Sequence, residues 1–421
     1  MSDKNDSGGG CLLFLIHWVF STIRKRRIRK YNRQARGVDV HSSAAVDALL
    51  PPGTYGDNII VSGGDQGERL RVCEQALRNA QSVGHPVIVL HAANSRLENI
   101  ITRSGLGAVV NASNKLFDGF ASLEFHEIVQ IVTDTCKARY EIKPPGRYIL
   151  QVVYELLAIQ GTRPYFAHFA NCPFLKLRDQ IASRLSTGRI TQDVADKLNS
   201  LLLTGQTECQ KVDAFFSDMK SQLEYMSATS PSSTGAEGIL SAIKKKQILS
   251  IDIRSSSNTM LLEFLVNTLV IAMNRGYDFT LLLDDIPFTS NDFLKSTVCQ
   301  RSNHRNIILS KDLYSLVGGK DETFNTIVGG AERAVLFAHS SSSSCDKWSK
   351  YLGEYEKIDV SYNDSGGFSQ SSNWGYNSHY GQTETLKREH KVKPEEIRTL
   401  SQNEAFIFDN MSNRLFRTFV V

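Results

Sequence analysis

The fold of this chain is decided by the stretch Phe279-Thr-Leu-Leu-Leu-Asp-Asp285, which Ile286-Pro287 follows. Four of its first five residues are apolar, a pattern typical of a strand that is buried on both faces of a parallel sheet. The carboxylates of Asp284 and Asp285 then stand at the carboxyl end of the strand, where open α/β sheets bind their ligands. A buried strand that ends in a solvated Asp-Asp turn explains the same residues, so the surrounding sequence has to decide.

Strands and helices alternate upstream of this stretch. Residues 58–61 and 86–90 are short apolar runs that predict strands, and residues 70–83 carry apolar side chains at helical spacing. The Gly-rich segment 62–69 joins the first strand to this helix. Strand, Gly-rich turn, helix and strand make one βαβ unit, with the turn where a phosphate-binding loop would lie.

The same alternation resumes after residue 240. Strands are predicted at 247–253, 306–310 and 333–338, and helices at 260–274 and 292–299. Such alternation predicts an α/β fold with a mostly parallel sheet that helices cover on both faces. We expect the strands near residues 58, 247, 279 and 306 to lie near the centre of this sheet.

Residues 121–228 follow a different pattern, because they contain amphipathic helical repeats and no convincing strand. They predict an all-α domain inserted between two parts of the α/β domain, residues 50–120 and 240–421. Within the second part, residues 340–385 are rich in Ser, Asn, Gly and Tyr and are predicted to be mostly loop. A short helix at 392–400 and β segments at 404–408 and 415–420 end the chain.

The N-terminal residues 1–40 form a tail with an asymmetric charge pattern. The apolar run Cys11-Leu-Leu-Phe-Leu-Ile-His-Trp-Val-Phe20 precedes the basic cluster Arg24-Lys-Arg-Arg-Ile-Arg-Lys30. The run is shorter than the roughly 20 apolar residues that cross a bilayer, and its positive charge follows it, unlike in a signal peptide. Residues 11–36 therefore favour a helix on an anionic membrane surface, with a disordered tail or a helix packed on a partner as alternatives.

Composition bounds the remaining classes. The chain has 421 residues and a formal charge of +4, which is too small to predict a nucleic-acid binder by itself. Its seven cysteines are scattered and contain no C-x-x-C pair, which argues against a zinc site and a disulfide framework. This cysteine usage fits a reducing compartment and so predicts a cytoplasmic protein.

The chemistry of a P-loop NTPase requires two motifs. In the Walker A loop, G-x-x-x-x-G-K-[S/T], backbone N–H groups surround the phosphates, the Lys neutralises them and the hydroxyl holds Mg²⁺. Aligned on Gly67, this chain has Glu68 in place of the lysine and Arg69 in place of the hydroxyl residue. The Walker B strand would end in Asp284, which would hold Mg²⁺, and Asp285, which would polarise an attacking water.

The candidate loop supports two interpretations. It is either a Gly-rich strand-to-helix turn, with Glu68 in the first helical turn, or a nucleotide site that binds weakly and hydrolyses slowly or not at all. Glu68 would repel a triphosphate, while Arg69 supplies positive charge but cannot ligate Mg²⁺. The candidate nucleotide-binding residues are Gly63, Gly64, Asp65, Gln66, Gly67, Glu68 and Arg69.

The order of these parts resembles the TraG/TraD-type coupling ATPases of conjugation and type IV secretion, in the FtsK/HerA-like branch of P-loop proteins. Residues 58–69 stand where that family has its Walker A loop, and 121–228 match its inserted all-α domain. Residues 248–285 match the approach to Walker B. The strand at 303–310 and the signature-like segment 391–408 follow in the family's order, so the resemblance covers roughly residues 50–421.

This resemblance implies a RecA/FtsK-like P-loop fold, ATP and Mg²⁺ as cofactors, self-association in a ring, and a DNA or secreted-protein substrate. It places Lys311 where the family has a glutamine that senses the γ-phosphate. Arg301 and Arg305 become candidates for arginine fingers that act across the ring, although a solvated turn is the favoured explanation of these residues.

The departures from the family lie at the residues that would bind and hydrolyse the nucleotide, so two hypotheses for the function remain. The first is a coupling ATPase-like protein, weak or inactive in hydrolysis, and the intact Asp284-Asp285 pair favours it for nucleotide binding. The second is a non-enzymatic scaffold or membrane-peripheral adaptor that binds a partner through its helical domain. Glu68, Arg69 and Lys311 favour the second.

Overall fold

The computed structural model describes residues 8–41, 58–114, 116–223, 238–255, 259–287, 304–368 and 376–420, without the side chains of 8–18, 361–368 and 376–382. Within it the chain divides into two compact units. We call residues 44–335 the core unit, and residues 1–43 together with 336–420 the terminal unit. The predicted helix at 292–299 and the candidate finger Arg301 lie outside the described residues.

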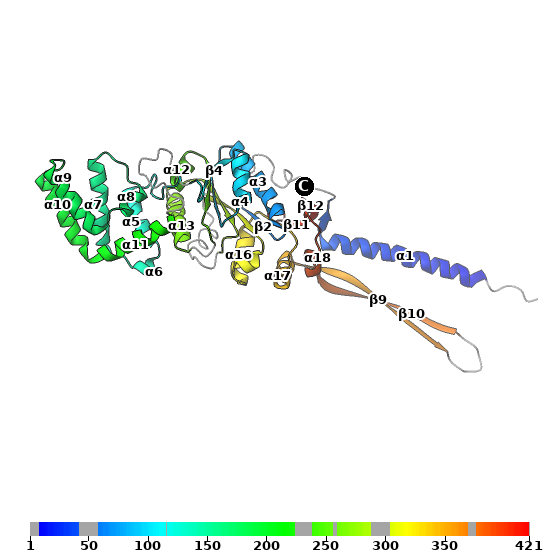
Figure 1. Ribbon diagram of the computed structural model, residues 1–421. Coiled ribbons are helices and arrows are strands. Elements are labelled where there is room, and N and C mark those ends of the chain that lie inside the picture. Colours follow the sequence, from blue (N-terminus) through cyan, green and yellow to red (C-terminus); the bar gives the residue numbers. More distant parts are fainter. Residues whose placement is uncertain are drawn as a thin grey trace, which may run out of the picture. The chain divides into compact units, whose positions relative to one another are not determined.

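The core unit is built on a sheet with the strand order β8-β2-β7-β6-β3-β5-β4. In Figure 1, where β2 and β4 are labelled, helices surround this sheet. All neighbours from β2 to β4 pair in parallel. Every residue of β6 is buried, because its apolar run faces helices on both sides. The strands are β2 (Ile59–Ser62), β3 (Val87–His91), β4 (Gly107–Val110), β5 (Ile248–Asp252), β6 (Phe279–Asp284), β7 (His304–Ser310) and β8 (Arg333–Leu336). The predicted α/β fold with a mainly parallel sheet is confirmed.

One part of the predicted strand order was wrong. The strands near residues 279 and 306 lie side by side inside the sheet, but β5, near residue 247, lies beside the edge strand β4. The reason is that β3 inserts between β6 and β5, which local periodicity cannot reveal. Strand β4 was not predicted, because it is a four-residue run that begins with Gly107. A side chain at Gly107 would have its Cβ 2.2 Å from the carbonyl oxygen of Ile248.

Helix α13 (Thr259–Asn274) is buried on most of its surface, with eleven buried residues, as its nearly continuous apolar sequence requires. Helix α3 (Gln66–Ser82) follows the Gly-rich turn and starts four residues earlier than the apolar pattern indicated. Its first turn is polar, so apolar spacing could not mark its beginning. The remaining helices around the sheet are α4 (Ser95–Arg103), α12 (Ile239–Lys244), α15 (Leu313–Leu316) and α16 (Asp321–Gly330).

The expected helical region is present, and its described residues 121–223 contain no strand. Its elements are α5 (Phe125–Asp134), α6 (Lys137–Tyr140), α7 (Gly146–Ile159), α8 (Phe166–Ala170), α9 (Phe174–Ser186), α10 (Gln192–Gly205), a 3-10 turn (Gln206–Glu208) and α11 (Cys209–Leu223). Phe120 packs edge-to-face on Phe169 and Phe216 and also contacts Phe264 of α13. The helical insertion therefore shares an aromatic core with α13.

The terminal unit corrects the prediction that residues 340–385 are mostly loop. It contains helix α17 (Ser342–Leu352) and a long antiparallel hairpin of β9 (Glu354–Phe368) and β10 (Tyr376–His390). The serine-rich sequence supplies the helix cap, since Ser341 accepts from the Ser344 N–H group at 3.4 Å. The hairpin was missed because the Ser-, Asn- and Gly-rich composition of this segment is typical of loops, although Ile358, Val360 and Tyr362 of β9 alternate with polar residues.

The rest of the terminal unit is a small sheet, two helices and their connections. Strand β12 (Arg414–Phe419) pairs in parallel with β1 (Val38–Val40) and antiparallel with β11 (Glu404–Asp409). The other helices are α1 (Gly8–Arg36) and α18 (Pro394–Arg398). None of the helices in the described part of the chain is long and apolar enough to cross a membrane.

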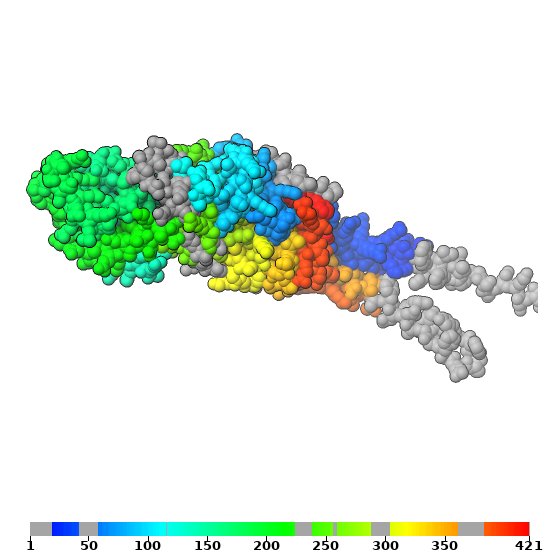
Figure 2. All heavy atoms as spheres, in the orientation of Figure 1, coloured from blue at the N-terminus to red at the C-terminus, as the bar shows by residue number. Residues whose placement is uncertain are grey.

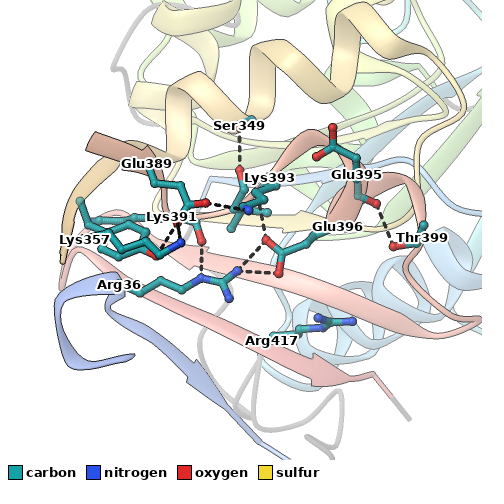
Figure 3. A network of polar contacts seen from close by, with 12 residues as sticks. Arg36, Ser349, Lys357, Glu389, Lys391, Lys393, Glu395, Glu396, Thr399 and Arg417 are labelled. Atoms are coloured by element: carbon teal, nitrogen blue, oxygen red, sulfur yellow. Dashed lines mark hydrogen bonds and ion pairs between the residues drawn. The ribbon is translucent and has the colours of Figure 1, made fainter. Parts of the chain in front are cut away.

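Helix α1 is joined to the base of the hairpin and to α18 by polar contacts (Figure 3). The guanidinium of Arg36 donates to both carboxylate oxygens of Glu396, at 2.7 and 2.6 Å, and to the Lys391 carbonyl at 2.6 Å. The Asn32 side-chain amide exchanges two hydrogen bonds with the backbone of Ile358, at 3.0 and 2.9 Å. In Figure 2 the blue atoms of α1 and the orange atoms of the hairpin accordingly lie side by side.

Candidate functional site

The Gly-rich turn lies at the carboxyl edge of the core sheet, attached to the neighbouring strand β7. Gly63 and Gly64 follow the end of β2 with φ of 87° and 66°, a left-handed conformation that favours glycine. The Gly63 N–H group donates to the Ser310 carbonyl at 3.0 Å. The Ser62 hydroxyl accepts from the Leu313 N–H group at 3.2 Å. The start of the turn is therefore attached to the end of β7 and to the segment that follows it.

The carboxylate of Glu68 belongs to the cap of α3. Asp65 Oδ1 accepts from the Glu68 N–H group at 2.8 Å, and Glu68 Oε2 accepts from the Asp65 N–H group at 2.7 Å. This reciprocal capping box stabilises a helix start by about 1 kcal/mol. The interpretation of Glu68 as a first-turn acid agrees with this geometry. Both carboxylates engage N–H groups at the turn, where a phosphate loop would offer such groups to its ligand.

The side chain of Arg69 fills the inside of the turn. It is only 6% exposed, and its Nη1 donates to the carbonyls of Gly63 and Gly64 at 3.1 and 2.8 Å. Its Nη2 lies 3.7 Å from Oδ2 of Asp285. The Gly-rich turn and the Asp284-Asp285 pair therefore do meet at one edge of the sheet, with a guanidinium between them.

The two carboxylates at the end of β6 have different environments. Asp284 is 7% exposed and accepts a hydrogen bond from the Asn94 side-chain amide. Burial raises the pKa of Asp284, the Asn94 hydrogen bond opposes this rise, and the nearby charge of Asp285 adds to it. Asp285 is more exposed, with φ of 51°, and its Oδ1 accepts from the Lys311 N–H group at 2.8 Å.

A polar cluster beyond Asp284 was not predicted from the sequence. Asn94 caps α4 by accepting from the Leu97 N–H group at 3.0 Å, and its own N–H group donates to Nδ1 of His91 at 3.2 Å. Nε2 of His91 faces a Glu98 carboxylate oxygen at 3.7 Å. Burial lowers the pKa of His91 to about 4, so its ring is neutral near pH 7. The available signal was the sequence itself, because His91 and Asn94 directly follow the strand predicted at 86–90.

The remaining candidates are distributed differently. Lys311 reaches the site through its backbone N–H group, while its side chain is exposed. Arg305 lies at the amino end of β7, the opposite end from Ser310, and Nη1 donates to the His304 carbonyl at 3.2 Å. Seven residues of strand span about 20 Å, so Arg305 is not part of this cluster within one chain. Its role across a ring interface stays a prediction.

The residues present do not form the usual site for Mg²⁺ and a nucleoside triphosphate. That site needs a lysine for the phosphates and a hydroxyl that faces the Walker B acid across the cation. Here the lysine position caps the helix, and Arg69 at the hydroxyl position binds the loop carbonyls instead. The described residues also contain no group of three His, Cys, Asp or Glu side chains suited to a metal ion.

Comparison with known proteins identifies structural neighbours only. No protein-family model and no curated protein matches the sequence. The chain is similar to the bacterial conjugative coupling protein TrwBΔN70, with 13% identity, a TM-score of 0.52, and coverage of 90% of this chain and 88% of that one. It is also similar to TrwB in complex with the non-hydrolysable ATP analogue ADPNP, with 13% identity, a TM-score of 0.52 and coverage of 90% and 89%.

A third structure, TrwB in complex with ADP and Mg²⁺, has 12% identity, a TM-score of 0.51 and coverage of 90% and 89%. At this level of identity the similarity shows a shared fold and does not show shared catalytic or binding residues. The expectation drawn from the order of the motifs is confirmed for the fold: this chain has the P-loop NTPase-like α/β fold of the conjugative coupling protein TrwB.

Proposed function

We propose that this chain is a coupling-protein-like P-loop protein that acts in DNA or protein transfer, as in conjugation or type IV secretion, and that its nucleotide site is weak or inactive in hydrolysis. The shared fold over 90% of the chain supports the first part, because the neighbour is named a conjugative coupling protein. ATP and Mg²⁺ enter as candidate ligands because TrwB structures contain a nucleotide analogue, or ADP and Mg²⁺.

The observation that carries the second part is the placement of Arg69. Stabilisation of charge on the transferred phosphoryl group is the main catalytic contribution in P-loop enzymes. In this chain the guanidinium is bound to the carbonyls of Gly63 and Gly64 and faces Asp285, so its donors point at the protein. A phosphate group would have to displace these contacts before the charge could act on it.

Calorimetry with Mg²⁺ and ATP, together with a phosphate-release assay, tests this proposal on the wild type and on Glu68→Lys/Arg69→Ser. We expect weak or undetectable binding and turnover by the wild type, and tighter binding by the double variant, which restores both Walker A residue types. The double variant loses the capping box and should be about 1 kcal/mol less stable for that reason. Turnover by the wild type at rates of about 1 per second or more would refute the proposal.

A non-enzymatic scaffold is the second candidate function. Two large apolar side chains on the helical insertion favour it, since Leu175 on α9 is 75% exposed and Leu203 on α10 is 68% exposed. A scaffold would retain self-association without nucleotide. Sedimentation velocity should then show the same association state with and without ATP. Leu175→Ser/Leu203→Ser should weaken binding of the partner that the helical insertion recognises while leaving the fold intact.

We further propose that residues 11–36 contact an anionic membrane surface. In the described part of α1, Phe20 is 68% exposed, and Arg26 and Arg27 are also exposed. Each basic residue near an anionic surface adds about 1 kcal/mol of binding at low salt. Deletion of residues 1–36 should abolish flotation with anionic liposomes, and Arg26→Gln/Arg27→Gln should weaken it more than the control Lys350→Gln/Arg388→Gln. Flotation of the truncated chain would contradict the proposal.

A further inference from the structure

The surroundings of Arg69 are those that proteins usually offer to a hard metal cation. Its guanidinium binds two backbone carbonyl oxygens, those of Gly63 and Gly64, at 3.1 and 2.8 Å. A carboxylate oxygen of Asp285 lies 3.7 Å away. Carbonyl and carboxylate oxygens are also the ligands that Mg²⁺ and Ca²⁺ prefer. The positive charge of this side chain therefore stands among oxygen atoms that could otherwise attract a divalent cation.

Arg69 is a positive charge that acts on the carboxylates at this edge of the sheet. Asp284 and Asp285 are adjacent, and the burial of Asp284 makes its ionised form costly. The charge of Arg69 acts on Asp284 in the opposite direction and favours its ionised form. Arg69 is itself 6% exposed, and its Nε is buried without a hydrogen-bond partner among the described residues. The buried guanidinium is thus held by the two carbonyl hydrogen bonds through Nη1, and its Nη2 faces a carboxylate.

We propose that the guanidinium of Arg69 is a built-in cation that takes the place of the divalent metal ion in this site. The position supports this assignment, because Arg69 aligns with the Walker A hydroxyl residue, whose partner in P-loop proteins is Mg²⁺. A covalently attached cation cannot be removed by a chelator, and it excludes a second cation from the same space by repulsion. Only the prediction about nucleotide affinity depends on the proposed nucleotide site. The prediction about divalent-cation binding does not.

Two consequences follow for binding. The wild-type protein should bind no divalent cation at Asp284 and Asp285, and any affinity for a nucleotide should be the same in Mg²⁺ and in EDTA. Arg69→Ser removes the guanidinium and leaves a hydroxyl beside the two carboxylates. That variant should gain a divalent-cation site.

Titration with Mn²⁺, followed by electron paramagnetic resonance of the free ion, tests the proposal without nucleotide. Arg71→Ser is the matched control, because it removes one charge from an exposed position on the same helix. We expect Arg69→Ser to bind one Mn²⁺ per chain at least about tenfold more tightly than the wild type or Arg71→Ser. Arg69→Ser/Asp285→Asn should lose this gain.

A second variant protects the test against failure to fold. Arg69→Gln keeps an amide donor for the loop carbonyls and removes the charge, so it should also gain Mn²⁺ binding, and circular dichroism checks the fold of each variant. Binding of Mn²⁺ by the wild type that Asp285→Asn removes would overturn the proposal. So would equal binding by Arg71→Ser and the two Arg69 variants.

Calorimetry with ADP in Mg²⁺ or EDTA separates this proposal from the proposed function. If neither the wild type nor any of the variants binds ADP, the chain has no nucleotide site. The Mn²⁺ result would still decide the role of Arg69. Wild-type affinity for ADP that falls about tenfold or more in EDTA would overturn the built-in cation.

Discussion

Arg275→Met tests how strongly α5 of the helical insertion is attached to the end of α13. Arg275, just after α13, donates from Nε to Oε1 of Glu127 on α5 at 2.6 Å and makes a second contact through Nη2. The side chains are only 19% and 7% exposed, so this is a largely buried, bidentate ion pair. The Glu127 hydrogen bonds raise the pKa of Arg275, which is consistent with a bound guanidinium.

The expected magnitude follows from what Glu127 retains. Removing one partner of a buried ion pair costs about 3–5 kcal/mol, because the other charge stays buried without compensation. Glu127 Oε2 still accepts from the Glu124 N–H group at 2.7 Å, so we expect a loss near the lower limit, about 3 kcal/mol. Glu127→Gln/Arg275→Met buries no charge and keeps an acceptor for that N–H group. It should therefore recover to within about 1 kcal/mol of the wild type.

Urea unfolding combined with hydrogen exchange of α5 and α13 measures the effect globally and locally. The control is Arg139→Met, which breaks an exposed pair with Asp218 and should cost less than about 1 kcal/mol. The reasoning fails if Arg275→Met costs no more than this control. It also fails if the double variant is no more stable than the single one.

Three further predictions concern other parts of the chain. Burial lowers the folded-state pKa of His91 to about 4, below the value of about 6.5 in the unfolded chain. The contribution of His91 to the free energy of unfolding should therefore be complete above pH 6.5 and fall toward pH 4 by up to about 1.4 kcal/mol per pH unit. Urea unfolding of His91→Gln at several pH values should show a flatter pH dependence than the wild type. Parallel pH profiles would contradict this. Arg36→Ala should speed amide exchange in the last turns of α1 by releasing Glu396 and the Lys391 carbonyl, whereas Arg33→Ala at an exposed position should not. Gly107→Ala should speed amide hydrogen exchange in β4, because the new Cβ would lie 2.2 Å from the Ile248 carbonyl oxygen. Gly330→Ala is the control, because a Cβ there has open space. Equal protection of the β4 amides in both variants would refute the packing argument.

The sequence by itself determined the features that depend on neighbours along the chain. The apolar run before Asp284 predicts β6, the nearly continuous apolar segment at 260–274 predicts α13, and helical spacing predicts the helical insertion. Each of these patterns repeats over one element, so local periodicity is sufficient. The order of the elements was also informative, because it carried the resemblance that the fold comparison supports.

Only the tertiary structure decided the order of the strands and the partners of the polar side chains. Nothing local indicates that β3 inserts between β6 and β5, or that the amide of Asn94 reaches Asp284, because such contacts join residues far apart in the chain. The hairpin after α17 shows the same limit, since it depends on pairing between two strands in a segment whose composition is typical of a loop.

The candidate site illustrates the division most clearly. Residue types placed Glu68 and Arg69 at the positions of the Walker A lysine and hydroxyl residue, but they could not say which way either side chain would turn. In the folded chain Glu68 turns back to cap α3, and Arg69 turns inward to the loop carbonyls and Asp285. The physical reason is that a buried charge takes the partners that folding brings within reach, and those partners come from the turn itself and from the distant Asp285.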